Sequence, residues 1–354
     1  MSYRGENLIF IISQPKAGST LLQRILAGHP DIQTSAETWL MLHPTYGLRK
    51  MGITADYNAN WAATGVREFL DNYADGRETY NEGVRSFAET IYGSVLEKHG
   101  KRLFLDKTPR YTMIVDELYE LFPKAKYILL IRNPLAILKS ELHTYVKEDW
   151  PMLAYFTPDL VDAPGRLIAA RDTLGDAGLE VCYEELVTRP EDTVRSLCTF
   201  LDIEFSETML DYSNTPAPKG RMNDPVGIHQ HSGVSQDSLD KWKALGNNDQ
   251  TRHFAFAYLD ALGAGTIAEL GYDAADMRRQ LEATTVETPV RHVYPWSLAI
   301  RRGDRLGNRG HEQSAYYIAA QQGGRLAGLR AGAKEIWKRL GGSVRRIFAS
   351  GSAQ

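Results

Sequence analysis

The chain has 354 residues, of which 43% are hydrophobic and 24% are charged, and its net charge at pH 7 is -3. This is the composition of a globular protein, and the small negative charge gives no indication of nucleic-acid binding. The two cysteines, Cys182 and Cys198, are too few for a disulfide framework. No apolar run approaches the roughly 20 residues of a membrane-spanning helix. An apolar pattern begins at Leu8, which leaves no room for a signal peptide, so we expect a cytoplasmic protein.

The first predicted elements are a strand, a short loop and a helix. Residues 8–12 form an apolar run, the letters SQPKAGST follow, and a helical pattern extends over residues 19–28. A loop between a strand and a helix directs backbone N–H groups and the positive end of the helix dipole toward an anion. Gly18 lets the backbone come close to that anion, and Ser19 and Thr20 add hydroxyl donors. The pattern predicts a phosphate-binding loop.

The order of residues in this loop differs from that of the nucleotide triphosphatases. In their loop the lysine directly precedes the Ser/Thr that binds magnesium. Here Lys16 precedes Gly18, and the first glycine of that motif is absent. A phosphate-loop kinase is therefore the less favoured alternative, and we expect no metal. A non-catalytic nucleotide-binding protein is the other alternative.

Short apolar runs and long helical patterns alternate along the rest of the chain. Strands are predicted at residues 103–105, 127–131 and 181–183, and helices within 58–100 and from 190 to about 201. Short buried strands separated by helices are typical of a parallel sheet with crossover helices. We therefore predict an α/β fold, with a central parallel sheet and helices on both faces.

A second candidate anion site follows the strand at residues 127–131. Arg132 comes directly after this strand, and Ser140 lies on the helical segment that follows. Parallel sheets bind ligands at the carboxyl ends of their strands. Two anion sites at two strand ends fit a nucleotide that is phosphorylated at both its 5′ and its 3′ position.

Several segments resemble, in order, those of the sulfotransferases that use 3′-phosphoadenosine 5′-phosphosulfate. PKAGSTLL resembles their 5′-phosphosulfate loop, and YILLIRNPLAILKSEL resembles their 3′-phosphate segment. Further similar segments are LDKTPRY, VCYEELVTRPED, LDKWKALG and ELGYD, so that the resemblance covers residues 8–273. It is nearest to the branch of protein-tyrosine sulfotransferases and many bacterial sulfotransferases of carbohydrates and natural products.

The resemblance implies a P-loop-type sulfotransferase fold over residues 1–283. The implied reaction moves a sulfuryl group from 3′-phosphoadenosine 5′-phosphosulfate, as co-substrate, to a hydroxyl or amine of a carbohydrate, lipid, natural product or peptide. Adenosine 3′,5′-bisphosphate is the implied second product. The implied donor-binding residues are Lys16, Ala17, Gly18, Ser19, Thr20, Arg132, Ser140, Tyr183 and Lys241.

The implied catalytic residues are two lysines and an acid. Charge builds up on the leaving phosphate during sulfuryl transfer, so a cation there stabilises the transition state, and Lys16 is the candidate. Lys107 resembles the family lysine that contacts the sulfonate. The acceptor must lose a proton, and Glu37, in SAET, matches the position of the catalytic glutamate in the GEET of the protein-tyrosine branch. Other branches use histidine, so His43 is the alternative base.

The predicted domain is followed by a C-terminal extension over residues 284–354. Within residues 325–354, seven Lys or Arg side chains and one Glu give a net charge of +6. Apolar residues such as Leu329, Ile336 and Trp337 fall on one helical face, which predicts a basic amphipathic helix. Such a helix binds a membrane surface or docks on the protein's own domain. A peripheral contact of residues 325–348 with the inner membrane face is therefore one expectation, and docking is the other.

Overall fold

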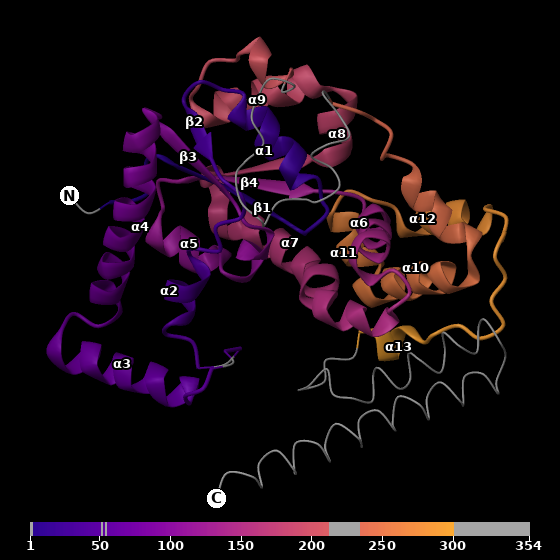
Figure 1. The fold of residues 1–354 in the computed structure, drawn as a ribbon, viewed down its shortest axis with the longest axis horizontal. Helices are drawn as coiled ribbons and strands as arrows, with labels where there is room; N and C mark the ends of the chain where they lie inside the picture. The colour runs from indigo at the N-terminus through magenta and orange to yellow at the C-terminus, as the bar shows by residue number, and fades with distance from the viewer. Residues whose placement is uncertain (1–2, 51, 54, 212–233, 301–354) are drawn as a thin grey trace, which may run out of the picture. The chain divides into compact units, whose positions relative to one another are not determined.

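The computed structural model describes residues 3–50, 52–53, 55–211 and 234–300 (Figure 1). It forms two compact units, which are described separately. The first comprises Met1–Asn133 and Ala163–Asp237, and the second comprises Pro134–Asp162 and Ser238–Gln354. No helix in the described part is long and apolar enough to cross a membrane. The predicted helix at residues 325–348 lies outside the described residues, and the domain boundary at residue 283 stays a prediction.

A five-stranded parallel sheet forms the centre of the first unit, with strand order β2-β3-β1-β4-β5. The strands are β1 (Leu8–Ser13), β2 (Ile32–Thr34), β3 (Leu103–Lys107), β4 (Lys126–Ile131) and β5 (Gly178–Cys182). The four predicted strands are confirmed within a few residues. The sequence prediction missed β2, which has three residues, two of them polar.

The register of the sheet brings three chemically important segments to one edge. Ile11 of β1 pairs with Lys107 at the end of β3, and Ser13 pairs with Leu130 near the end of β4. All three strands run in the same direction. The loop after β1, the side chain of Lys107 and the chain after β4 therefore meet at the carboxyl edge of the sheet, where parallel sheets bind ligands.

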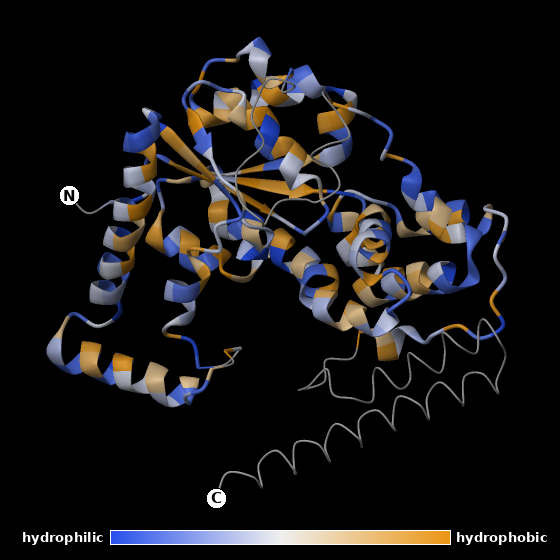
Figure 2. Ribbon diagram, viewed as in Figure 1, coloured by the Kyte–Doolittle hydropathy of each residue, from blue (hydrophilic) through white to orange (hydrophobic). Residues whose placement is uncertain are grey.

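Helices cover both faces of this sheet (Figure 1), as predicted. One face carries α1 (Ser19–Ala27) and α9 (Pro190–Leu201), with α8 (Tyr183–Thr188) leading into α9. The other face carries α4 (Arg77–His99), α5 (Val115–Leu121) and α7 (Ala163–Leu174). Alternate side chains of β1 point to opposite faces of the sheet. Leu8, Phe10 and Ile12 pack in the apolar cluster that also contains residues of α4, α5 and α7. Figure 2 shows the resulting hydrophobic strands between helices with polar outer faces.

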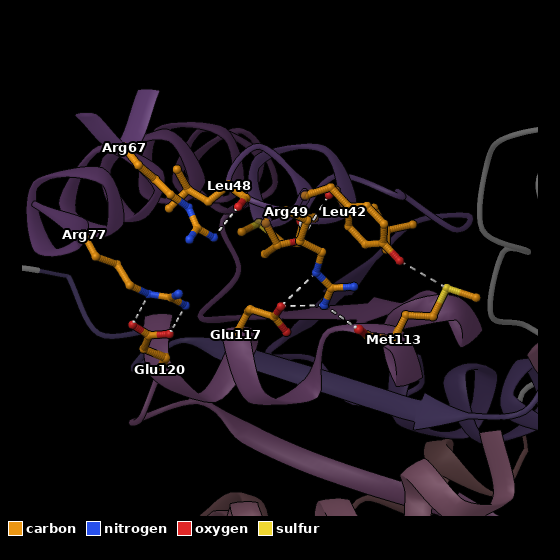
Figure 3. A network of polar contacts seen from close by, with 11 residues as sticks. Leu42, Leu48, Arg49, Arg67, Arg77, Met113, Glu117 and Glu120 are labelled. Atoms are coloured by element: carbon orange, nitrogen blue, oxygen red, sulfur yellow. Dashed lines mark hydrogen bonds and ion pairs between the residues drawn. The ribbon is translucent and has the colours of Figure 1, made fainter. Parts of the chain in front are cut away.

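Arginine contacts hold α2 (Leu42–Tyr46) and α3 (Ala59–Tyr73) to the rest of the first unit (Figure 3). Arg49 donates to the Glu117 carboxylate at 3.0 Å and to the Met113 carbonyl at 2.8 Å, while Arg67 donates to the Leu48 carbonyl at 2.6 Å. Arg77 pairs with Glu120. The three arginines, Leu48, Glu117 and Glu120 line a cavity of about 190 Å³. They fix the chain that leads away from residue 37.

Short helices connect the remaining parts of the first unit. They are the 3-10 helices η1 (Pro109–Met113), η5 (Gly175–Ala177) and η6 (Glu207–Met209). The first of them follows β3 directly. It therefore continues the chain from the carboxyl edge of the sheet.

The described part of the second unit is helical. Its elements are α6 (Pro134–Glu141), η2 (Leu142–Val146), η3 (Trp150–Phe156), η4 (Pro158–Asp162), η9 (Lys241–Asn247), α10 (Asp249–Leu262), α11 (Ala264–Glu269), α12 (Ala274–Glu282) and α13 (Trp296–Ala299). Aromatic rings form part of its core. Phe254 contacts Trp150 and Trp296 edge-on, with ring centroids 5.4 and 5.8 Å apart. These contacts join η3, α10 and α13.

Candidate active site

The loop after β1 has the backbone that a phosphate-binding turn requires. Gly18 has a φ of 95° and Lys16 a φ of 65°, both in the left-handed region that favours glycine. A Cβ atom on Gly18 would overlap the ring of Tyr183, which is buried at the start of α8. Gly18 is thus required for its conformation and for the close approach of Tyr183.

Arg132 connects this loop to the Tyr183 ring. Its Nη1 donates to the Lys16 carbonyl at 2.8 Å, and its guanidinium carbon lies 4.1 Å from the centroid of the Tyr183 ring. The side chain is buried, and its Nε has no hydrogen-bond partner among the described residues. A buried donor without an acceptor costs free energy, which a bound anion would recover. The structure therefore brings together Lys16, Gly18, Arg132 and Tyr183.

Glu37 and Lys107, predicted as base and sulfonate contact, touch each other. Lys107 Nζ donates to Glu37 Oε1 at 3.0 Å, and Trp39 Nε1 donates to Glu37 Oε2 at 3.2 Å. The Lys107 side chain is 1% exposed and that of Glu37 is 20% exposed. Within the described part of the chain, Glu37 is the one partner of the Lys107 ammonium, which has three N–H donors. Two donors are thus left for an oxygen-rich ligand.

Asp106 organises the surroundings of this pair, a role that the sequence analysis missed. Its carboxylate accepts four hydrogen bonds, from the hydroxyls of Thr38 (2.6 Å), Tyr92 (2.7 Å), Tyr111 (2.9 Å) and Thr108 (3.0 Å). Burial raises the pKa of Asp106, while the donated hydrogen bonds oppose that rise. Thr38 follows Glu37 in the chain, so Asp106 fixes the backbone that carries the candidate base. An acidic residue inside a buried strand was the available signal.

The other predicted loop residues lie at the start of α1. The Ala17 N–H donates to the Gln14 carbonyl at 3.2 Å and so closes the turn. Ser19, the first residue of α1, is buried, and Thr20 is half-buried behind it. These positions agree with a strand–loop–helix junction. Contact with a nucleotide stays a prediction.

Among the described residues, the contacts given above for Glu37, Lys107 and Arg132 do not include His43, Ser140 or Lys241. His43 is exposed on α2, and the described polar contacts of Glu37 and Lys107 do not include it. Ser140 lies on α6 and Lys241 begins η9, both in the second unit. Their roles in donor binding stay predictions.

Comparison with known proteins identifies the family. Residues 8–207 match the model of the Sulfotransferase family. The chain is 28% identical to nodulation protein NoeE of Sinorhizobium fredii, over 85% of this chain and 75% of that protein. It is 25% identical to a putative protein-tyrosine sulfotransferase of Caenorhabditis briggsae, over 77% of this chain and 91% of that protein.

A solved structure is also similar. The sulfotransferase domain from the curacin biosynthetic pathway matches with a TM-score of 0.49 and 24% identity, over 69% of this chain and 92% of that domain. The family model itself spans more than half of the chain, from β1 to η6. The chain therefore belongs to the sulfotransferase family.

Proposed function

We propose that this sulfotransferase moves a sulfuryl group from 3′-phosphoadenosine 5′-phosphosulfate to a hydroxyl or amine of its acceptor. The observation that carries the proposal is the contact of Lys107 with Glu37 at 3.0 Å, at the carboxyl edge of the sheet. The buried Lys107 ammonium and the Glu37 carboxylate lie at the same sheet edge as the predicted phosphate-binding loop. A protein that only bound a nucleotide would not need a base at that position.

The residues of the first unit suit a nucleotide with two phosphate positions. The loop from Lys16 to Thr20 supplies a cation and two hydroxyls for the 5′ side. Arg132, whose Nε has no hydrogen-bond partner among the described residues, supplies the cation for the 3′-phosphate. We also propose that Ser140 and Lys241 bind the donor. A buried arginine suits phosphate because its planar fork binds two oxygens at once.

In the proposed reaction, the acceptor oxygen or nitrogen forms a bond to sulfur while the bond from sulfur to the phosphate oxygen breaks. The leaving phosphate keeps the electron pair, and the Lys16 ammonium stabilises its growing charge. Lys107 holds the sulfonate oxygens with the N–H groups that Glu37 does not use. Glu37 takes the proton from the acceptor as general base. Trp39 and Lys107 orient its two carboxylate oxygens.

We propose several classes of acceptor rather than one. Carbohydrates, lipids, natural products and peptides all present the hydroxyl or amine that this chemistry needs. One of the relatives is named as a putative protein-tyrosine sulfotransferase, and this name describes the acceptor of that protein only.

We also propose that the enzyme is cytoplasmic and that its residues 325–348 contact the inner membrane face.

The proposal predicts a clear preference among nucleotides. Adenosine 3′,5′-bisphosphate should raise the melting temperature strongly, because a ligand that binds only the folded state stabilises it by mass action. ATP with magnesium should raise it much less, because the loop lacks the lysine–hydroxyl order that holds the metal. Differential scanning fluorimetry with both nucleotides measures this. A larger shift with ATP and magnesium would favour a phosphate-loop kinase.

A further inference from the structure

The second unit contains a cavity of about 420 Å³ outside the residues assigned above to catalysis or donor binding. Sites for small molecules have volumes of about 300–1,000 Å³, so the cavity is large enough for such a ligand. It is lined by residues of α6, η2, the start of η3, η9 and the start of α10, and by Lys147 after η2. All of these elements belong to the same unit.

The floor of the cavity is apolar. Leu142, Trp150 and Leu245 line it and are 5%, 6% and 3% exposed, respectively. The Trp150 ring is held edge-on by Phe254, so this wall is part of a packed core. An apolar group that entered the cavity would leave water and gain free energy in proportion to the area that it buries.

The rim of the cavity is basic. Lys139, His143 and Lys147 line it, and no carboxylate lines it among the described residues. The Lys147 ammonium has no ion-pair partner within the described part of the chain. Side chains of one sign around an apolar floor raise the local concentration of ligands that carry the opposite charge.

The backbone fixes Lys147 at this rim. Residues Leu142–Val146 form a π-helical turn, and the Lys147 N–H donates to the Leu142 carbonyl at 2.7 Å. Lys147 itself has a φ of 52°, in the left-handed region. Turns of this kind are uncommon and frequently occur at functional sites.

Trp150, in the apolar floor, carries a hydrogen-bond donor that the described residues do not satisfy. Its side chain is buried, and its Nε1 has no hydrogen-bond partner among the described residues. A buried donor without an acceptor carries its full desolvation cost.

We propose that this cavity binds a small amphipathic anion, an alkyl or aryl group that ends in a carboxylate, sulfate or phosphate. The apolar group lies on the floor of Leu142, Trp150 and Leu245, and the anion is held at the rim by Lys147 and its neighbours. This site goes beyond sulfuryl transfer. Neither the donor-binding residues nor the Glu37–Lys107 pair takes part in it.

Isothermal titration of the full-length protein with decanoate tests the proposal, with decanol and inorganic sulfate as comparisons. Decanoate should bind saturably. Decanol lacks the anion and sulfate lacks the apolar group, so each should bind at least about tenfold more weakly, the loss expected for one charge-assisted hydrogen bond or a few buried methylenes. A parallel titration with 2-naphthoate distinguishes an aryl from an alkyl ligand.

Variants of the lining residues locate the binding. Lys147→Asn removes the charge while keeping a residue that tolerates positive φ, and it should weaken decanoate about tenfold. Trp150→Phe keeps an aromatic residue but reduces the apolar area of the floor, and it should weaken decanoate severalfold. Lys243→Gln is the matched control, because Lys243 lies in the same unit, pairs with Asp240 and does not line the cavity. Its affinity for decanoate should be unchanged.

Three results would overturn the proposal. The first is equal decanoate affinity in Lys147→Asn and in Lys243→Gln. The second is equal affinity of the wild-type protein for decanoate and decanol. The third is displacement of decanoate by adenosine 3′,5′-bisphosphate, which would make the cavity part of the donor site. If adenosine 3′,5′-bisphosphate does not change the affinity for decanoate, the result supports the proposal. This holds whichever nucleotide stabilises the protein more in the fluorimetry experiment.

Discussion

Replacing Glu37 with Gln should lower kcat by about 10²–10⁴-fold, the usual contribution of a general base. Gln keeps an oxygen that can accept from Lys107 Nζ, so the buried ammonium keeps a hydrogen bond. The variant loses the capacity to take the acceptor's proton at neutral pH, together with the charge beside Lys107 and the acceptor for Trp39 Nε1. Its affinity for adenosine 3′,5′-bisphosphate should stay close to that of the wild-type protein. Steady-state kinetics and a bisphosphate titration on the same preparation separate the two effects.

His43→Ala is the matched control for this experiment. His43 is the other candidate base from the sequence, and it lies exposed on α2, outside the contacts of Glu37 and Lys107. We expect its kcat to stay near the wild-type value. The reverse result, with normal turnover in Glu37→Gln and a large loss in His43→Ala, would transfer the role of base to His43.

Replacing Arg132 with Ala should weaken the binding of adenosine 3′,5′-bisphosphate by about 10- to 100-fold. This corresponds to the roughly 1.5–3 kcal/mol that a hydrogen bond to a charged group contributes. The loss has two sources, because Arg132 also donates to the Lys16 carbonyl and packs on the Tyr183 ring. Arg132→Lys keeps the charge without the planar fork and should recover part of the affinity. Isothermal titration gives the three Kd values.

Arg102→Ala is the control for Arg132. Arg102 is exposed, pairs with Asp31 at 3.2 Å and precedes β3, at the opposite edge of the sheet. Its removal should leave bisphosphate affinity unchanged. If Arg132→Ala and Arg102→Ala bind the nucleotide equally well, Arg132 is a structural residue of the loop and the 3′-phosphate lies elsewhere.

Features that depend on neighbouring residues could be predicted from the sequence. The loop was visible because a strand, Gly18 and a helix start follow one another directly, and α1 and α9 begin at Ser19 and Pro190 as expected. The strand β2 was missed because its three residues carry little apolar pattern. It is ordered by its neighbour β3 and by the Thr34 hydroxyl on the Leu105 carbonyl.

Features that depend on contacts between residues far apart in the chain were harder to predict from the sequence. The apolar spacing of α3 predicted the helix, but it did not show that Phe69 and Tyr73 are 62% and 81% exposed while Leu70 is buried. The sequence suggested Lys107 and Glu37 separately. Their contact requires a sheet edge that joins residues 70 positions apart. Asp106 was passed over because its four hydroxyl partners come from three segments of the chain.

The transfer of labelled sulfonate tests the central claim most directly. The protein is incubated with ³⁵S-labelled 3′-phosphoadenosine 5′-phosphosulfate and an extract of the cells that produce it, without magnesium, beside the Glu37→Gln variant. We predict a labelled product that forms with the wild-type protein, appears together with an equal amount of adenosine 3′,5′-bisphosphate, and is nearly absent with Glu37→Gln. The claim is contradicted if the wild-type protein forms no labelled product, or if the variant forms as much of it.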